Sequence, residues 1–356
     1  MPVGSPVQFF GDIKKIDPNA FGFFYCKITA PDNLLHPVIQ THVKHNNMVR
    51  TMAPLGQWYD FIFSEEIKNA ENYGYKFEVL WGYKFNRLNI FKHYVDNLYN
   101  LRMSYSRSNP LNYIAKLLMN SLYGRFGMRD SFPKINIFNN IESFKDWFDK
   151  YNEDVLDFLG LGEKILVQHR SELQDQKTML YGYLETHNVN IAIAAAITAY
   201  ARMHMSQFKN NPNFKLYYTD TDSAYIDRAL PDYMVSNTEL GKLKLENICN
   251  KAIFLAPKFY WLETEDAKVI YKVKGLKHEI NLNFYDFESL LYKESFLQKF
   301  QNKWVKNLSE GNIKIMNELY TLKVTENKRQ LIFDNNKLIR SVPYFINSNK
   351  EIVKSN

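Results

Sequence analysis

The chain has 356 residues, a formal net charge of +7 and only two cysteines, Cys26 and Cys249. Two cysteines exclude a disulfide-rich scaffold and are typical of a reducing compartment. The longest strongly apolar run, 191–200, is well short of the roughly 20 residues that a helix needs to span a bilayer, so we expect no membrane partner. The positive charge suits a polyanionic partner and equally an ordinary basic protein.

Residues 1–86 are expected to form strands around one short helix. The segment 23–29 is rich in aromatic and β-branched side chains and precedes a turn signal, which predicts a strand. A second strand is expected over 79–85. Between them, apolar side chains recur at helical spacing over 65–74 and predict a helix that ends at Gly74.

The next segments carry a helical period. Over 88–102, apolar side chains fall at i, i+3, i+4, i+7 and i+8, which predicts an amphipathic helix. Asn109 and Pro110 then supply a cap and a proline for the first helical position. The second helix is expected to run to about Tyr123 and to end at Gly124. Two antiparallel helices joined by a short turn would form a finger-like projection.

The rest of the chain is less regular. Residues 128–185 are acidic and aromatic, and we interpret them as a solvated helical insertion without chemistry. An alanine-rich helix is expected over 190–207 and a hairpin over 215–226. After Gly275 the sequence predicts a mixed, lysine-rich terminal lobe.

A pair of carboxylates marks the hairpin Tyr218-Thr219-Asp220-Thr221-Asp222-Ser223. Because successive side chains of a strand point to opposite faces, Asp220 and Asp222 would share one side while Thr221 points away. Two adjacent carboxylates repel each other, and Mg²⁺ would neutralise them through the oxygen ligands it prefers. The alternative is an ordinary polar turn, which the tetrapeptide alone favours.

A polar stripe marks the second finger helix. Asn112, Lys116, Asn120 and Tyr123 lie on one side of it, where the lysine would bind a triphosphate and the ring would pack on a base or sugar. Arg102, near the end of the preceding helix, would add a phosphate contact. The other side is expected to pack inward and carries four apolar residues, Ile114, Leu117, Leu118 and Leu122. A plain exposed face with a core tyrosine is the alternative.

These motifs together resemble a known family. Lys116-x-x-x-Asn120-Ser121-x-Tyr123-Gly124 resembles motif B of the family B DNA polymerases, and Tyr218-x-Asp220-Thr221-Asp222-Ser223 resembles their motif C. The order of the two motifs also matches. Lys258-Phe259-Tyr260 resembles the Lys-x-Tyr motif of the protein-primed branch, which contacts the primer strand. The resemblance extends over most of the chain.

The resemblance implies a role for each nucleotide-site residue. Asp222 would be the main metal ligand and Asp220 an auxiliary one, together binding two Mg²⁺ ions. Lys116 would hold the triphosphate, while Asn120 and Tyr123 would line the nascent base pair. The implied reaction is template-directed nucleotidyl transfer from deoxynucleoside triphosphates (dNTPs).

The same resemblance implies the nucleic-acid contacts. Lys258 and Tyr260 would steady the primer end. Five lysines are candidates for phosphate contacts, although each one taken singly fits a solvated surface lysine better: Lys242, Lys244, Lys272, Lys274 and Lys277. The implied partners are primer-template DNA and dNTPs, and a terminal priming protein is a further possible partner. Linear plasmids of fungal and plant mitochondria carry this branch, and the heavy use of Asn, Lys, Ile, Phe and Tyr is typical of A/T-rich coding DNA, so a mitochondrion is the expected location.

An α+β, right-hand polymerase core is the implied fold, with a partial palm sheet, two-helix fingers and a small thumb. The expected domains are the N-terminal part of the palm at 1–86, fingers at 87–127, an insertion at 128–185, palm with the catalytic hairpin at 186–275, and thumb at 276–356.

One family motif is not found in the 356 residues. This is motif A, Asp-x-x-Ser-Leu-Tyr-Pro, which supplies the other essential metal ligand. In relatives it lies just upstream of a segment resembling Met1-Pro2-Val3-Gly4. We therefore expect a truncated form with impaired activity. The alternative is a non-catalytic DNA-binding remnant, or one half of a split polymerase.

Overall fold

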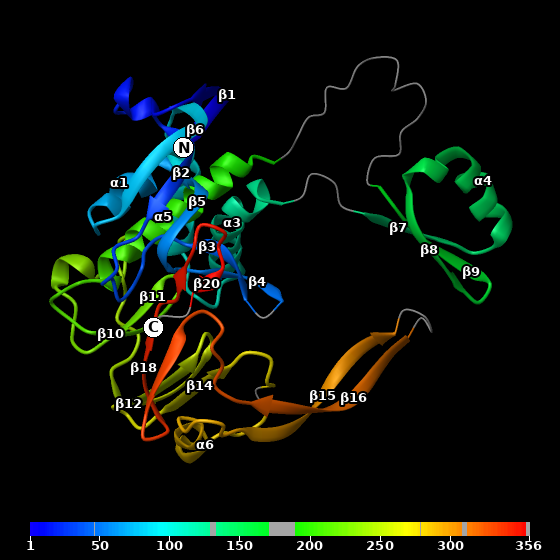
Figure 1. Ribbon diagram of the computed structural model, residues 1–356. Helices are drawn as coiled ribbons and strands as arrows, with labels where there is room; N and C mark the ends of the chain where they lie inside the picture. The colour runs from blue at the N-terminus through cyan, green and yellow to red at the C-terminus, as the bar shows by residue number, and fades with distance from the viewer. Residues whose placement is uncertain (46, 129–132, 171–188, 278, 308–311, 354–356) are drawn as a thin grey trace. The chain divides into compact units, whose positions relative to one another are not determined.

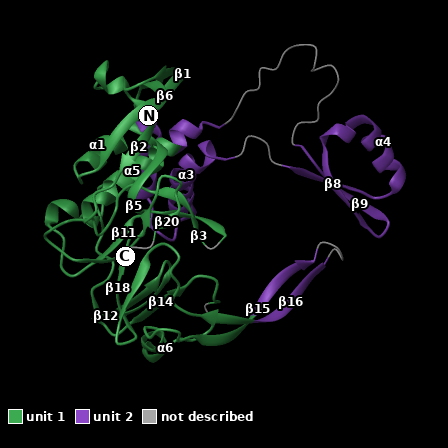
Figure 2. Ribbon diagram, in the orientation of Figure 1, with its two compact units in different colours: residues 1–89, 195–301, 319–356 green, residues 90–194, 302–318 purple. Residues whose placement is uncertain are grey.

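A computed structural model describes residues 1–45, 47–128, 133–170, 189–277, 279–307 and 312–353 (Figure 1). The chain divides into two compact units (Figure 2). Unit 1 comprises 1–89, 195–301 and 319–356, and unit 2 comprises 90–194 and 302–318. In the described part of the chain, no helix is long and apolar enough to cross a membrane.

The largest sheet belongs to unit 1 and has six strands in the order β1-β6-β2-β5-β19-β20. Strand β19 runs parallel to β5, and the other neighbouring pairs are antiparallel. The strands are β1 Pro2–Phe10, β2 Gly22–Thr29, β5 Leu55–Phe63, β6 Lys76–Arg87, β19 Phe345–Ile346 and β20 Ile352–Val353. The predicted strands over 23–29 and 79–85 are thereby confirmed.

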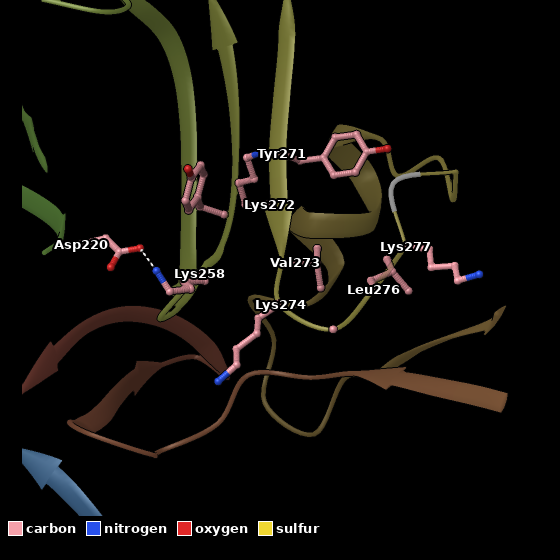
Figure 3. Close-up of a pocket in the computed structure, with 10 residues that line it drawn as sticks. Asp220, Lys258, Tyr271, Lys272, Val273, Lys274, Leu276 and Lys277 are labelled. Atoms are coloured by element: carbon pink, nitrogen blue, oxygen red, sulfur yellow. Dashed lines mark hydrogen bonds and ion pairs between the residues drawn. The ribbon is translucent and has the colours of Figure 1, made fainter. Parts of the chain in front are cut away.

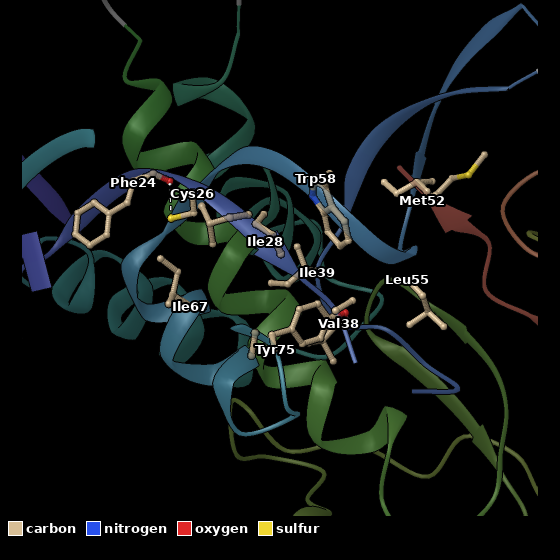
Figure 4. Close-up of a cluster of buried hydrophobic side chains, with 14 of the residues drawn as sticks. Phe24, Cys26, Ile28, Val38, Ile39, Met52, Leu55, Trp58, Ile67 and Tyr75 are labelled. Carbon is tan, nitrogen blue, oxygen red and sulfur yellow. Dashed lines mark hydrogen bonds between the residues drawn. The ribbon is translucent and has the colours of Figure 1, made fainter. Parts of the chain in front are cut away.

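Strict alternation along β2 creates the main core. Phe24, Cys26 and Ile28 are fully buried on one face, whereas the residues between them are partly exposed. Trp58 of the neighbouring strand and Ile67 of helix α1 Ser64–Glu71 join the same cluster (Figure 4). We call strands β1, β2, β5 and β6 with α1 and residues 195–209 of helix α5 (Ile191–Lys209) the sheet body.

Helices α1 and α5 are joined by a largely buried ion pair. Helix α1 confirms the helix expected over 65–74 but ends at Glu71, before the predicted end at Gly74, whose φ of +86° lies in the left-handed region that glycine tolerates. Helix α5 runs over Ile191–Lys209, which confirms the helix expected at 190–207. Its Arg202 donates to both oxygens of Glu66 at 2.7 and 2.8 Å, and Glu66 is only 4% exposed. Such a forked pair satisfies a carboxylate that burial would otherwise penalise.

Smaller sheets complete unit 1. The hairpin β10–β11 follows α5, and a three-stranded sheet has the order β12-β13-β14. The ribbon β15–β16 comes next in the chain, and its residues fall in both units. The elements are β3 Thr41–His45, β4 Met48–Met52, β10 Leu216–Asp220, β11 Ser223–Ile226, β12 Cys249–Ala256, β13 Phe259–Thr264, β14 Val269–Val273, α6 Phe284–Ser289, β15 Leu297–Asn307, β16 Asn312–Leu322, β17 Gln330–Asp334 and β18 Lys337–Val342, with 3-10 turns at Ile13–Lys15 and Asp232–Met234.

Two helices, α2 Lys92–Met103 and α3 Pro110–Phe126, open unit 2 and confirm the predicted helix pair. Asn109 caps α3 by accepting from the backbone N–H of Leu111 at 2.9 Å, with Pro110 at the first position, as expected. The predicted end at Gly124 is wrong, because the helix continues to Phe126 and Gly127 caps it. A glycine weakens a helix without ending it when the following residues still form the helical bonds.

The remainder of unit 2 corrects another expectation. The acidic segment contains one helix, α4 Ile141–Tyr151, and a three-stranded sheet of order β7-β9-β8, so a helical insertion is wrong for the described residues. Aromatic rings of α4 pack on this sheet, as the contact of Phe144 with Phe158 shows. Residues 171–188 lie outside the described part. The elements are β7 Lys134–Phe138, a 3-10 turn Asn152–Asp154, β8 Val155–Leu161 and β9 Lys164–His169.

Candidate active site

The carboxylate hairpin forms where it was predicted, but its tip differs from the expected geometry. Asp220 ends β10, and Asp222 lies in the turn, not on a strand. The backbone N–H of Asp222 donates to the carbonyl of Asp220 at 2.7 Å, and Thr221 between them has a φ of +57°. This is the bond pattern of a tight three-residue turn, which is strained for a β-branched residue.

Thr221 also has a different role from the one predicted. It does not point away, because its hydroxyl donates to Asp220 Oδ1 at 3.2 Å. The hydroxyl of Ser223 donates to the Asp220 carbonyl at 3.1 Å and closes the turn from the other strand. The positions of the two carboxylates are therefore set by the strained turn at Thr221 and not by the alternation of side chains along a strand.

A lysine from the next sheet reaches the first carboxylate. Lys258 Nζ donates to Asp220 Oδ2 at 2.5 Å (Figure 3). Lys258 itself has a φ of +58°, and its backbone N–H donates to the Tyr218 hydroxyl at 2.8 Å. The hydrogen bond with Asp220 raises the pKa of Lys258 above its ordinary value, so the amine stays cationic.

Four aromatic rings hold the hairpin against the β12-β13 pair. Tyr218 stacks on Phe254 with centroids 5.1 Å apart and planes 7° from parallel. Tyr225 and Tyr260 contact both of these rings at 5.1 to 6.0 Å. Burial raises the pKa of the Tyr218 and Tyr225 hydroxyls, so both stay protonated near neutral pH. Tyr260, predicted to steady a primer, is thus also part of the hairpin's support.

A pocket of about 400 Å³ opens beside Asp220, and we call it the lysine pocket. Figure 3 shows Lys258 turned toward Asp220, while Lys274 and Lys277 extend from the turn after β14. The chain lines it with Asp220, Lys258, Tyr260, Tyr271, Lys272, Val273, Lys274, Gly275, Leu276 and Lys277. The lining thus carries four lysines and one carboxylate, which suits an anionic ligand such as a phosphate chain.

The structure thus brings together Asp220, Lys258, Tyr260, Lys272 and Lys274, all predicted site residues, in one pocket of unit 1. Other lining residues, notably an aromatic ring and a leucine, belong to no sequence motif and were not predicted. Only their position beside the lysines of β14 could have indicated them; they are Tyr271 and Leu276.

The two carboxylates have oxygen donors that fit a divalent cation. The Asp222 side chain is exposed and has no hydrogen bond or ion pair within the described residues. Asp220 already has a cation, the Lys258 amine, at one oxygen. Negative oxygens that attract a cation are also the ligands that Mg²⁺ prefers. Among the described residues no group of three or more His, Cys, Asp or Glu is placed to hold a metal ion.

The predicted nucleotide residues lie in unit 2. Lys116, Asn120 and Tyr123 are exposed along α3, with Tyr123 47% exposed, and Arg102 is half-buried in the last turn of α2. Asn112 has another role: its side-chain amide donates to the carbonyls at the end of α2 and fixes the turn between the helices. The inward packing expected for the apolar side is wrong, because most of it is 42–51% exposed, namely Ile114, Leu117 and Leu118.

Known proteins resemble this chain in sequence. A family model for DNA polymerase type B, organellar and viral, matches residues 1–214. A probable DNA polymerase of Ascobolus immersus is 36% identical over 356 residues, covering 98% of this chain and 28% of the relative. A probable DNA polymerase of Neurospora intermedia is 35% identical over 326 residues, covering 89% and 33%. The chain therefore spans a third or less of these two relatives.

The fold is also similar to a solved structure. Phi29 DNA polymerase complexed with primer-template DNA and incoming nucleotide substrates superposes with a TM-score of 0.62 at 17% identity. The superposition covers 91% of this chain and 55% of that chain. This likeness confirms the expected α+β polymerase fold.

Proposed function

The chain belongs to the organellar and viral type B DNA polymerases, and from this premise we propose that it is the polymerase portion of a DNA-directed DNA polymerase. It would add nucleotides from dNTPs to a primer on a DNA template. The observation that carries the proposal is the hairpin of Asp220 and Asp222, held rigidly beside a pocket lined by four lysines. Carboxylates next to a phosphate-binding surface are what phosphoryl transfer requires.

The hairpin is the proposed metal-binding element. Asp222, whose exposed side chain has no hydrogen bond or ion pair within the described residues, would be the main ligand of Mg²⁺, and Asp220 an auxiliary one. Two Mg²⁺ ions, when bound, would lower the pKa of the primer hydroxyl and stabilise the leaving pyrophosphate. The strained turn at Thr221 and the aromatic support keep the carboxylates in place before any ligand arrives.

The lysine pocket is the proposed primer site. Lys272 and Lys274 have no ion pair within the described residues, so their charges are available to backbone phosphates. Lys258 would contact the primer end from its position on Asp220, and the ring of Tyr260 lines the same space. Such contacts fix the position of a nucleic acid without reading its sequence.

Helix α3 is the proposed nucleotide-binding helix. Lys116 would bind the triphosphate, Asn120 and Tyr123 would line the nascent base pair, and Arg102 would add a phosphate contact; the exposure of the first three along one helix supports this. The proposed domains are palm at 1–86 and 186–275, fingers at 87–127, an insertion at 128–185 and thumb at 276–356.

We further propose that this chain by itself turns over slowly. The pattern Asp-x-x-Ser-Leu-Tyr-Pro, which carries the other metal ligand in the family, does not occur in its 356 residues. The second candidate function is therefore DNA binding without turnover, as a remnant or as one half of a split polymerase. Three pocket lysines that have no ion pair within the described residues favour it, namely Lys272, Lys274 and Lys277. Priming by a terminal protein and a place in mitochondria, on a linear plasmid, are part of the proposal, and the organellar family description supports the latter.

The test combines binding with chemistry. Fluorescence anisotropy measures the affinity for a labelled primer-template at several salt concentrations, and a gel assay measures addition of one nucleotide with Mg²⁺. We expect salt-sensitive binding and slow addition that Asp222→Asn lowers by about 100-fold or more, since a metal ligand supplies several kcal/mol of charge stabilisation. Asp32→Asn is the matched control, an exposed carboxylate distant in sequence from the hairpin.

Each outcome is informative. Binding without any addition supports the second candidate function. Absence of salt-sensitive DNA binding overturns both. An extension rate equal to that of complete relatives, abolished by Asp222→Asn, overturns the proposal of slow turnover.

A further inference from the structure

The turn that follows β14 carries two of the pocket lysines on a constrained backbone. Gly275 has a φ of +89°, and the N–H of Leu276 bonds back to the carbonyl of Val273 at 3.2 Å. Lys274 comes just before the glycine and Lys277 follows two residues after it. The shape of this turn therefore sets the direction in which the two amines leave the backbone.

A buried glutamine from β15 holds the turn. Gln301 is only 8% exposed, and its side-chain amide donates to the Gly275 carbonyl at 3.0 Å. Its amide oxygen accepts from the Lys277 backbone N–H at 3.1 Å. One side chain thus satisfies a donor and an acceptor on either side of Leu276 and fixes their separation.

A tyrosine from β16 holds the same turn from its other end. The Tyr320 hydroxyl donates to the Lys274 carbonyl at 2.6 Å. Its ring lies so close to Gly275 that a Cβ there would sit 3.1 Å from the hydroxyl oxygen and 3.3 Å from a ring carbon. The glycine is needed for the close approach of this ring as well as for its positive φ.

We propose that Gln301 and Tyr320 are positioning residues that preorganise Lys274 and Lys277 for phosphates of a bound DNA strand. Neither side chain contacts the DNA in this proposal; each acts through the backbone that carries the lysines. A turn fixed in advance loses less conformational freedom when the strand binds, so it raises affinity without adding a contact. The inference rests on the proposed DNA-binding role of the lysine pocket.

The test uses two variants of the whole chain. Gln301→Met keeps a similar volume and removes both hydrogen bonds, and Tyr320→Phe removes only the hydroxyl. Primer-template affinity is measured by anisotropy at several salt concentrations. We expect Gln301→Met to weaken binding by about tenfold and Tyr320→Phe by about threefold, the scale of two lost hydrogen bonds and of one. Gln298→Met, an exposed glutamine of the same strand, is the control and should leave affinity unchanged.

A second background separates positioning from a general loss of structure. In a chain with Lys274→Ala and Lys277→Ala, a residue that acts only through these lysines has nothing left to position, so Gln301→Met should have no further effect on affinity. A merely structural role would weaken binding equally in both backgrounds and would overturn the inference. If Gln301→Met does not fold, as thermal unfolding will show, the same comparison with Tyr320→Phe decides.

The lysine variant also separates this inference from the function beneath it. If Lys274→Ala with Lys277→Ala leaves the affinity and its salt dependence unchanged, the DNA-binding role of the pocket is wrong. If that variant weakens binding while Gln301→Met and Tyr320→Phe do not, the inference alone is overturned.

Discussion

The sheet body and the lysine pocket, both parts of unit 1, differ in how many of their charged side chains are paired with another charged side chain. In the sheet body the buried Glu66 is bonded through both oxygens to Arg202, so the pair is satisfied internally. In the pocket Lys272, Lys274 and Lys277 have no ion pair within the described residues. The body thus uses its charges to hold helices together, while the pocket retains cationic charge for a ligand.

This difference predicts which substitutions should lower the stability of the fold and which should change ligand binding. Changes in the sheet body remove buried contacts that no ligand supplies, so they should lower the free energy of unfolding. Changes in the pocket remove groups whose partner arrives only with the ligand, so they should alter binding and leave stability nearly unchanged.

The largest effect is expected at the centre of the sheet body. Trp58 is fully buried, and Trp58→Ala should lower the free energy of unfolding by about 3–5 kcal/mol through loss of apolar contact and the cavity left behind. Urea unfolding measures this. Trp58→Phe is the control and should cost clearly less, because the indole N–H has no hydrogen-bond partner within the described residues. If the Trp58→Ala molecules that remain folded bind DNA more weakly, the separation between stability in the sheet body and binding in the pocket is wrong.

A smaller effect concerns the pH dependence of stability through His36, which lies in the segment between β2 and β3. Burial, with Arg329 and Lys209 nearby, lowers the pKa of His36 from 6.5 to about 4. The folded state therefore favours neutral His36, so stability is fully present above about pH 6.5 and falls as the pH drops toward 4. Because the ring is partly exposed, we expect a loss of about 1–2 kcal/mol.

Thermal unfolding across this pH range measures the loss, and His36→Gln should flatten that part of the profile. A wild-type profile no steeper than that of the variant would contradict the assignment to His36.

The smallest effect is expected in the pocket, where a substitution should change binding and leave stability unchanged. Lys258→Met removes the amine that competes with a metal ion for Asp220, so the hairpin should bind Mn²⁺ about fivefold more tightly, the scale of a screened charge pair. Primer-template binding should weaken at the same time, while the unfolding midpoint stays within experimental error. Electron paramagnetic resonance of free Mn²⁺ measures the first effect. Lys251→Met, an exposed lysine of β12, is the control.

Local patterns predicted most of the fold but not the details of the site. Two confirmed features depend only on residues close together in the sequence, so a short sequence segment is enough to predict them. They are the alternating burial of Phe24, Cys26 and Ile28, and the helix cap at Asn109. The sheet of the insertion escaped prediction because β7, β8 and β9 are short segments that pair only in the fold, whereas α4 has a clear helical period, with Ile141, Phe144 and Phe148 at i, i+3 and i+7.

The sequence indicated the residue types of the candidate site but not its geometry. The sequence indicated the hairpin carboxylates, yet the positive φ of Thr221 depends on bonds from Ser223 and Asp222 that no propensity encodes. Gln301 reaches Gly275 from far along the chain, and a lone glutamine in a strand has no local signal. Long-range hydrogen bonds of this kind appear only once the fold is known.

The thiol of Cys26 provides a built-in reporter of how often the central sheet opens. It lies at zero exposure in β2, and burial raises its pKa to about 12, so the reactive thiolate forms only when the strand separates from its neighbours. Cys249, at the start of β12, is partly exposed and should be labelled first. The alkylation rate of Cys26 in the native state, divided by the rate of the same thiol in the unfolded chain, therefore reports the opening free energy of the sheet body.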